Sequence, residues 1–181
     1  MIREICRMGN PVLRQKAAGI SRDYIVTEEF RQLVIDLRDS MKHYGGIGIA
    51  APQIGVSLQV AVIELASTNR YGEEVSLPFT VFVNPKLEFL TDEEQGFWEG
   101  CLSVPGLRGF VERPKKLKVT YLNEKGETKE LIAAGFLATV VQHELDHLFG
   151  VLYVDRLKDM SLLTYQEEYD QFLSGKEEEL E

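Results

Sequence analysis

Apolar residues early in the chain recur with the spacing of one helix face. These positions are Phe30, Leu33, Val34, Leu37 and Met41. A repeat of three and four residues predicts an amphipathic helix. Thr27 precedes the repeat as the expected N-cap, with two glutamates after it in the first turn. The glycines that follow Tyr44 place the end of this helix there.

The next stretch of the chain is richer in β-branched and aromatic residues, which predicts strands. Residues 58–65 form one such run and residues 79–83 form a second. Asn84 and Pro85 are expected to stop the second run, because proline cannot donate to a strand ladder. The polar residues 66–77 between the runs predict a surface excursion.

A hairpin is predicted further along. Residues 118–122 and 129–132 flank the turn sequence NEKG at residues 123–126. Before this hairpin, residues 86–96 predict a short strand and a polar turn.

Residues 135–149 are apolar on nearly every side of a helix. One stripe is Leu137, Val141, Leu145 and Leu148, and its neighbour is Phe136, Val140, His143 and His147. A helix of this kind predicts burial in a core. Gly150 should cap it, a short strand is expected at residues 151–154, and a helix with an apolar side at residues 160–173.

Together these elements predict an α+β fold, in which antiparallel or mixed β-sheets pack around the central helix of residues 135–149. A length of 181 residues suits a single domain with a full core. We expect that domain to span residues 1–174, followed by an acidic tail at residues 175–181.

Composition and charge narrow the class of protein. A net charge of −9 disfavours a general nucleic-acid binder, which needs a basic face. No apolar run reaches the length of a membrane span, and the N-terminus lacks the apolar centre of a secretory signal. Two cysteines do not make a disulfide framework, so a reducing compartment such as the cytoplasm is expected.

The sequence QHELDH at residues 142–147 places two imidazoles and two carboxylates in the buried helix. Residues four apart share a helix face, so His143 and His147 can bind one metal ion. Glu144 lies next to such an ion, where it can take a proton from water. Two histidines and a carboxylate are costly to bury unless something pairs them, which disfavours an incidental pair of histidines.

Sequence spacing alone does not identify the third protein ligand of the metal ion. Cys101 is one candidate, and Glu167 or Glu168 would instead complete a metallopeptidase site with two histidines and a glutamate. A Cys–His hydrolase is a weaker alternative, because it leaves the paired histidines unexplained. The alternative that is not an enzyme is a metal-binding or interaction module without catalytic activity.

The segment GIGIAAPQ at residues 46–53 resembles a dinucleotide-binding motif by letter only. That motif requires a strand before it and a helix after it, whereas here a helix precedes and Pro52 prevents a helix from opening. The small residues predict backbone that passes close to another group, with the amide of Gln53 available there.

Three motifs in this order, GIGIAAPQ at 46–53, EGCLS at 99–103 and QHELDH at 142–147, resemble those of the peptide deformylase family. The segments MGNPVLR near the N-terminus and VPGLRGFVERP after EGCLS are also similar to that family. The resemblance implies removal of the N-formyl group from the initiator methionine of new polypeptides, with release of formate.

By the same resemblance, Cys101, His143 and His147 are the expected metal ligands and Glu144 is the general base and acid. Gln53 and the backbone N–H of Leu102 are the expected oxyanion donors. Cys, His and His alone suggest zinc, whereas the resemblance implies Fe²⁺, which Zn²⁺, Ni²⁺ or Co²⁺ can replace.

The resemblance also implies a pocket for the formyl-Met residue. Its expected residues are Ile47, Gly48, Phe97, Gly100, Arg108, Phe136, Thr139 and Val140. Arg108 is expected to meet the peptide backbone of the substrate, and Glu99 is expected to form an ion pair with Arg113.

The expected partners are N-formyl-Met peptides and nascent chains, with no membrane partner. A basic C-terminal helix can dock such an enzyme on ribosomal RNA. Residues 166–181 hold seven acidic residues and one lysine, so we expect no nucleic-acid binding through the C-terminus.

Overall fold

A computed structural model describes residues 1–68 and 74–175. Its helices are α1 (Arg22–Ile25), α2 (Glu28–His43), α3 (Gly135–Asp146) and α4 (Gln166–Glu168). Its strands are β1 (Gly48–Ala50), β2 (Val60–Thr68), β3 (Glu74–Phe89), β4 (Glu94–Cys101), β5 (Val104–Pro114), β6 (Lys116–Leu122), β7 (Thr128–Ala134) and β8 (Leu163–Tyr165). They form a five-stranded sheet in the order β1-β2-β3-β6-β7 and a three-stranded sheet in the order β4-β5-β8.

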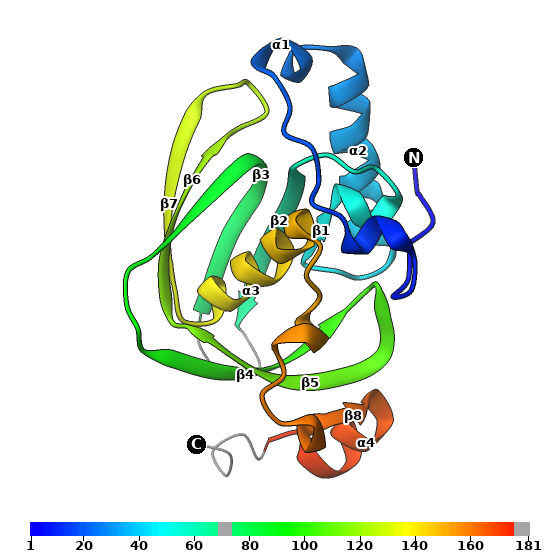
Figure 1. The fold of residues 1–181 in the computed structure, drawn as a ribbon, viewed down its shortest axis with the longest axis vertical. Coiled ribbons are helices and arrows are strands. Elements are labelled where there is room, and N and C mark those ends of the chain that lie inside the picture. Colours follow the sequence, from blue (N-terminus) through cyan, green and yellow to red (C-terminus); the bar gives the residue numbers. More distant parts are fainter. Residues whose placement is uncertain (69–73, 176–181) are drawn as a thin grey trace.

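Neighbouring strands in both sheets run antiparallel, which confirms the predicted α+β class. Figure 1 shows α3 near the centre of the molecule, with α1 and α2 at one end and α4 with β8 at the other. The helix thus lies where side chains from both sheets can meet it.

Alternation along β2 explains how the large sheet is covered on both faces. Ala61 and Ile63 pack in the core cluster that contains α3, whereas Val60 and Val62 pack in the cluster that contains α2. Successive side chains of a strand point to opposite faces, so β2 contributes to both cores. This double burial accounts for the nearly continuous apolar run at residues 58–65.

The ends of the helices follow the predicted capping residues. The Thr27 hydroxyl accepts a hydrogen bond from the Phe30 N–H at the start of α2, and Tyr44 caps its end. After α3 the chain makes a short 3-10 helix, His147–Phe149, and turns at Gly150 with φ +75°. A Cβ at Gly150 would lie 2.8 Å from the backbone of Arg14, so only glycine fits there.

The predicted hairpin between residues 118 and 132 is confirmed as β6 and β7, but the prediction around Pro85 was wrong. Strand β3 continues through Asn84 and Pro85 to Phe89. Its pairing with β6 shifts between Val83 and Lys86, and Asn84 adopts φ 48°. The Asn84 side chain bonds both the N–H and the carbonyl of Ile20, which holds this bulge in place.

Three further predictions differ from the structure. The expected excursion at residues 66–77 is strand at both ends, because β2 runs to Thr68 and pairs there with Glu74 of β3, and its residues 69–73 lie outside the described part of the chain. The expected strand at residues 151–154 is replaced by the 3-10 helix Tyr153–Arg156. The expected helix at residues 160–173 contains the 3-10 helix Met160–Leu162, strand β8, α4 and the π-helix Tyr169–Leu173.

The described helices include none that is long and apolar enough to cross a membrane. Of the predicted acidic tail, residues 176–181 lie outside the described part of the chain.

Candidate metal centre

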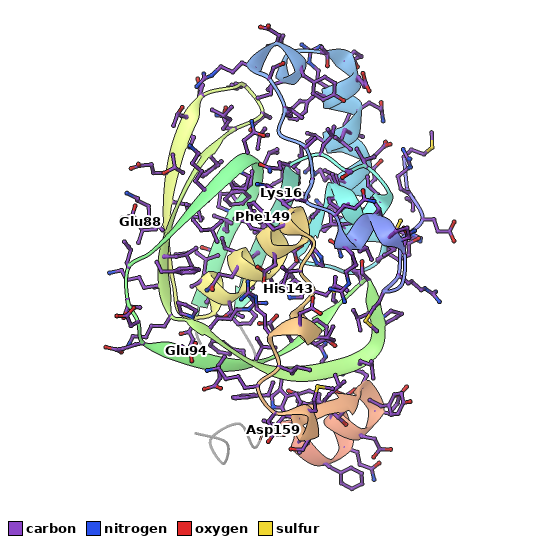
Figure 2. All side chains as sticks on the ribbon, viewed as in Figure 1. Lys16, Glu88, Glu94, His143, Phe149 and Asp159 are labelled. Atoms are coloured by element: carbon purple, nitrogen blue, oxygen red, sulfur yellow. The ribbon has the colours of Figure 1, made fainter. Side chains whose placement is uncertain are left out.

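The last turn of α3, the start of the 3-10 helix after it and the end of β4 bring together three metal-binding side chains. Cys101, His143 and His147, the ligand group, place one donor atom each within 4.8 Å of one another. Cys101 Sγ lies 3.5 Å from His147 Nε2, and the two imidazole rings are 5.3 Å apart at 81°. Figure 2 places His143 near the centre of the molecule. These contacts confirm Cys101 as the third member of the site.

Strand geometry explains why Cys101 reaches α3. Strands β4 and β5 form a hairpin so tight that Cys101 pairs with Val104, and the register shifts between Glu99 and Cys101. Such a bulge re-aims side chains, and it leaves Cys101 at the strand end beside the helix. Glu167, the alternative ligand, lies exposed on α4 and is not part of the described ligand group. The metallopeptidase alternative is therefore wrong.

Glu99 fixes the orientation of one histidine. Its Oε2 lies 2.7 Å from His143 Nδ1, so Nε2 is the ring atom left for a metal. Burial lowers the pKa of His147 well below its usual value, and the positive charge of Arg113 lowers it further. A neutral imidazole is the form that binds metal, so this environment favours ligation.

The predicted ion pair between Glu99 and Arg113 is confirmed, and it belongs to a larger buried network. Arg113 donates from Nε and Nη2 to the two oxygens of Glu99, at 2.6 and 3.0 Å. Its Nη1 donates to Asp146 at 2.8 Å, and Arg156 donates twice to the same carboxylate. Burial alone would raise the pKa of Glu99, but Arg113 and His143 outweigh that effect and lower it.

Glu144 lies in the same buried region with a carboxylate oxygen that is not hydrogen-bonded. Among the described residues, nothing bonds its Oε2, and burial raises the pKa of this carboxyl to about 7. An unsatisfied buried oxygen is costly unless water or a ligand meets it. The thiol and the two imidazoles can bind a divalent ion, and this carboxylate oxygen can accept a hydrogen bond from water beside it.

The main chain of β1 comes close to this carboxylate. A Cβ at Gly48 would lie 2.5 Å from Glu144 Cδ. The small residues of the GIGIAAPQ segment are therefore explained by close approach to Glu144, as their pattern predicts.

Gly48→Ala is expected to displace the Glu144 carboxylate while leaving metal content unchanged. A shift of about 1 Å in a catalytic group can reduce turnover about 10²-fold. Steady-state turnover and metal analysis test this, with Gly19→Ala as the control, since its added Cβ meets Asn84 at an ordinary 3.4 Å. Retention of most activity by Gly48→Ala would contradict the expected displacement.

The side-chain amide of Gln53 is held by both of its ends. Its Oε1 accepts a hydrogen bond from the Ala50 N–H at 2.8 Å. Its Nε2 lies 3.1 Å from Ser103 Oγ and 3.5 Å from Cys101 Sγ. The amide N–H₂ group is thus aimed at the side of the site where Cys101 lies.

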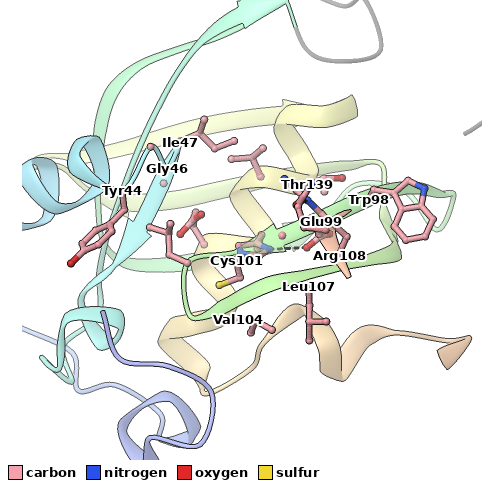
Figure 3. A pocket seen from close by; sticks show the side chains of 18 of the residues that line it. Tyr44, Gly46, Ile47, Trp98, Glu99, Cys101, Val104, Leu107, Arg108 and Thr139 are labelled. Carbon is pink, nitrogen blue, oxygen red and sulfur yellow. Dashed lines mark hydrogen bonds and ion pairs between the residues drawn. The ribbon is translucent and has the colours of Figure 1, made fainter. Parts of the chain in front are cut away.

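A cavity of about 490 Å³ opens over the ligand group (Figure 3). The predicted pocket residues Ile47, Gly48, Gly100, Arg108, Phe136, Thr139 and Val140 line it. Phe97 is outside the lining, and its ring packs against Phe136 at 5.4 Å. The sequence interpretation missed Tyr44, Leu107 and Gln166, which also line the cavity. Leu107 could have been predicted, because it is the neighbour of the predicted pocket residue Arg108. No motif in the sequence around Gln166 indicates that this residue lines a cavity.

Comparisons with known proteins agree with this geometry. The family model described as Polypeptide deformylase matches residues 2–162. A peptide deformylase of Leptospira biflexa is 45% identical over 170 residues, which cover 93% of this chain and 95% of the relative. Peptide deformylase 1 of Bordetella pertussis is 44% identical over 167 residues, covering 92% and 94%.

Two solved structures show the same fold. A class I type b peptide deformylase of Acinetobacter baumannii with bound Met-Ala-Ser has a TM-score of 0.81 and 36% identity, covering 87% of this chain and 99% of that one. A Synechococcus elongatus peptide deformylase in complex with actinonin has a TM-score of 0.77 and 39% identity, covering 93% and 85%.

Proposed function

This chain belongs to the polypeptide deformylase family, and we propose that Glu144, Gln53 and the main chain of Leu102 carry out the proton transfer and charge stabilisation of its reaction. The chain is a metal-dependent hydrolase that removes the formyl group from N-terminal formylmethionine. The observation that supports these roles is the buried Glu144 carboxylate, which lines the cavity together with Cys101 and His143.

Glu144 is the proton carrier. Cys101, His143 and His147 would hold a divalent ion, which when bound would lower the pKa of water and polarise a carbonyl group. Glu144 accepts the proton that water loses on attacking the formyl carbon, and then donates it to the leaving amine. A carboxyl whose pKa is raised to about 7 by burial suits both steps near neutral pH.

Gln53 and Leu102 supply donors for the negative charge that develops on the formyl oxygen. Both residues line the cavity beside Cys101. The Gln53 amide is already oriented by the Ala50 N–H, so it need not reorganise during the reaction. Removing one donor of this kind typically costs about 3 kcal/mol of transition-state stabilisation.

The methionine side chain is proposed to lie among Ile47, Phe136 and Val140, which are apolar lining residues close to Glu144. Phe97 supports this wall through its ring contact with Phe136 rather than by lining the cavity. Gly48, Gly100 and Thr139 complete it as smaller residues. Arg108, on the β5 side of the cavity, meets the peptide backbone beyond the methionine.

The native ion is proposed to be Fe²⁺. A thiolate and two imidazoles also suit Zn²⁺, and Ni²⁺ or Co²⁺ can substitute. Family membership, rather than the donor set, favours iron.

Protein prepared without oxygen and loaded with Fe²⁺ is expected to release formate from formyl-Met-Ala-Ser and to lose that activity in air. A cysteine thiolate is susceptible to oxidation, and iron beside it promotes such loss. The same protein loaded with Zn²⁺ is the control and should be stable in air but less active. Higher activity of the zinc form would overturn the assignment of iron, and no formate release from either form would contradict the proposed roles.

The substrates of the chain are peptides that begin with formylmethionine, and we propose nascent chains in the cytoplasm as their source. We assign catalysis to a single domain at residues 1–174. The acidic residues after it argue against docking on RNA through this terminus.

A further inference from the structure

The C-terminal segment contributes a side chain to the substrate cavity. Strand β8 pairs with β5, with Arg108 opposite Thr164. This pairing places Gln166, the first residue of α4, at the cavity edge, where it is one of the lining residues. The family model matches only residues 2–162, so this part of the cavity wall comes from beyond the matched region.

Gln166 binds Arg108 directly. Arg108 Nε donates to Gln166 Oε1 at 2.5 Å, and Gln166 Nε2 donates to Asp170 Oδ1 at 2.8 Å. Because both ends of the Gln166 amide are bonded, its oxygen stays turned toward the arginine. The ring of Tyr169 packs on Trp98 at 5.1 Å and anchors the segment to β4.

The guanidinium of Arg108 is confined on a second side. A Cβ at Gly100 would lie 2.7 Å from Arg108 Nη1, so the guanidinium rests against the backbone of Gly100. Figure 3 shows Arg108 and Leu107 with Glu99 and Cys101 around the same pocket. The position of the guanidinium is therefore set by β4 on one side and by Gln166 on the other.

We propose that Gln166 is a positioning residue that orients Arg108 toward the substrate backbone beyond the methionine. A neutral amide oxygen fixes the planar guanidinium without cancelling its charge. An oriented, charged donor binds peptide carbonyls or a terminal carboxylate more strongly than a mobile one. The inference rests on the proposed place of Arg108 in substrate binding.

Gln166→Leu is expected to raise KM for formyl-Met-Ala-Ser roughly fivefold, the effect of one hydrogen bond, with kcat and metal content unchanged. Formyl-Met amide ends before Arg108 is reached, so its KM should stay the same. Gln166→Glu keeps an acceptor for Arg108 but cancels its charge and loses the donor to Asp170, so its tripeptide KM should stay above that of wild type. Glu168→Gln, an exposed change on the same turn, is the control and should change nothing.

Adding Gln166→Leu to Arg108→Leu tests whether Gln166 acts through the arginine. The double variant should have the same KM as Arg108→Leu alone. An unchanged tripeptide KM in Gln166→Leu, an equal rise for formyl-Met amide, or a further rise in the double variant would each overturn the inference. Wild-type protein that deformylates neither substrate would instead contradict the proposed function.

Discussion

Replacing Glu144 by glutamine is expected to leave a folded, metal-loaded protein whose kcat for formyl-Met-Ala-Ser falls about 10³-fold. Glutamine has nearly the same shape as glutamate, so the contact with Gly48 and the packing of α3 are preserved. It cannot accept the proton that water gives up, and it cannot return one to the amine. The expected loss therefore lies in kcat, with little change in KM.

Metal analysis and formate release on the same preparation check this expectation. Glu144→Asp is a useful comparison, because it keeps a carboxylate but withdraws it by one methylene from the cavity. Its activity should fall between those of wild type and Glu144→Gln. Should Glu144→Gln retain a tenth or more of the wild-type kcat with metal bound, another group must carry the proton.

The parts of the fold that the sequence predicted are those determined by local pattern. Helix α2 has both a periodic face and a capping threonine, and α3 has an apolar surface and Gly150 after it. The β6–β7 hairpin has a recognisable turn. In each case neighbouring residues along the chain contain enough information to define the element.

The parts that were missed depend on contacts distant in sequence. Pro85 lies within β3 only because Asn84 bulges and bonds Ile20, 64 residues away. Strand β8 exists because β5 offers it an edge, while its own residues read as a helix face. Local propensity gives way to tertiary pairing at both places.

The functional site likewise has residues that local sequence predicts and residues that only distant contacts bring into place. The spacing of His143 and His147 predicts two ligands from one helix, but no spacing could choose between Cys101 and Glu167 for the third. That choice depends on a bulge at the end of β4 and was reached by resemblance to a family. Gln166 has no marker in its surroundings, and only the pairing of β8 with β5 brings it to the cavity.

Arg113→Met is expected to destabilise the metal-loaded protein by about 3–5 kcal/mol. Methionine fills a similar volume, so the change removes charge and hydrogen bonds without opening a large cavity. Arg113 is 1% exposed, and its loss would leave the carboxylates of Glu99 and Asp146 buried without their shared cation. Burial alone would lower the pKa of Arg113, but Glu99 and Asp146 raise it above its ordinary value, so both acids favour the charged guanidinium.

Arg156→Met is the matched control, since Arg156 also binds Asp146 but its side chain is 43% exposed. Partial exposure screens that pair, so a loss of about 1 kcal/mol or less is expected. Urea unfolding of the three proteins gives the comparison. Arg113→Met should also weaken metal binding about 10- to 100-fold, because Glu99 orients His143. If both arginine variants lose the same free energy of unfolding, burial does not determine how much each arginine stabilises the protein. An Arg113→Met protein of wild-type stability would contradict the expectation outright.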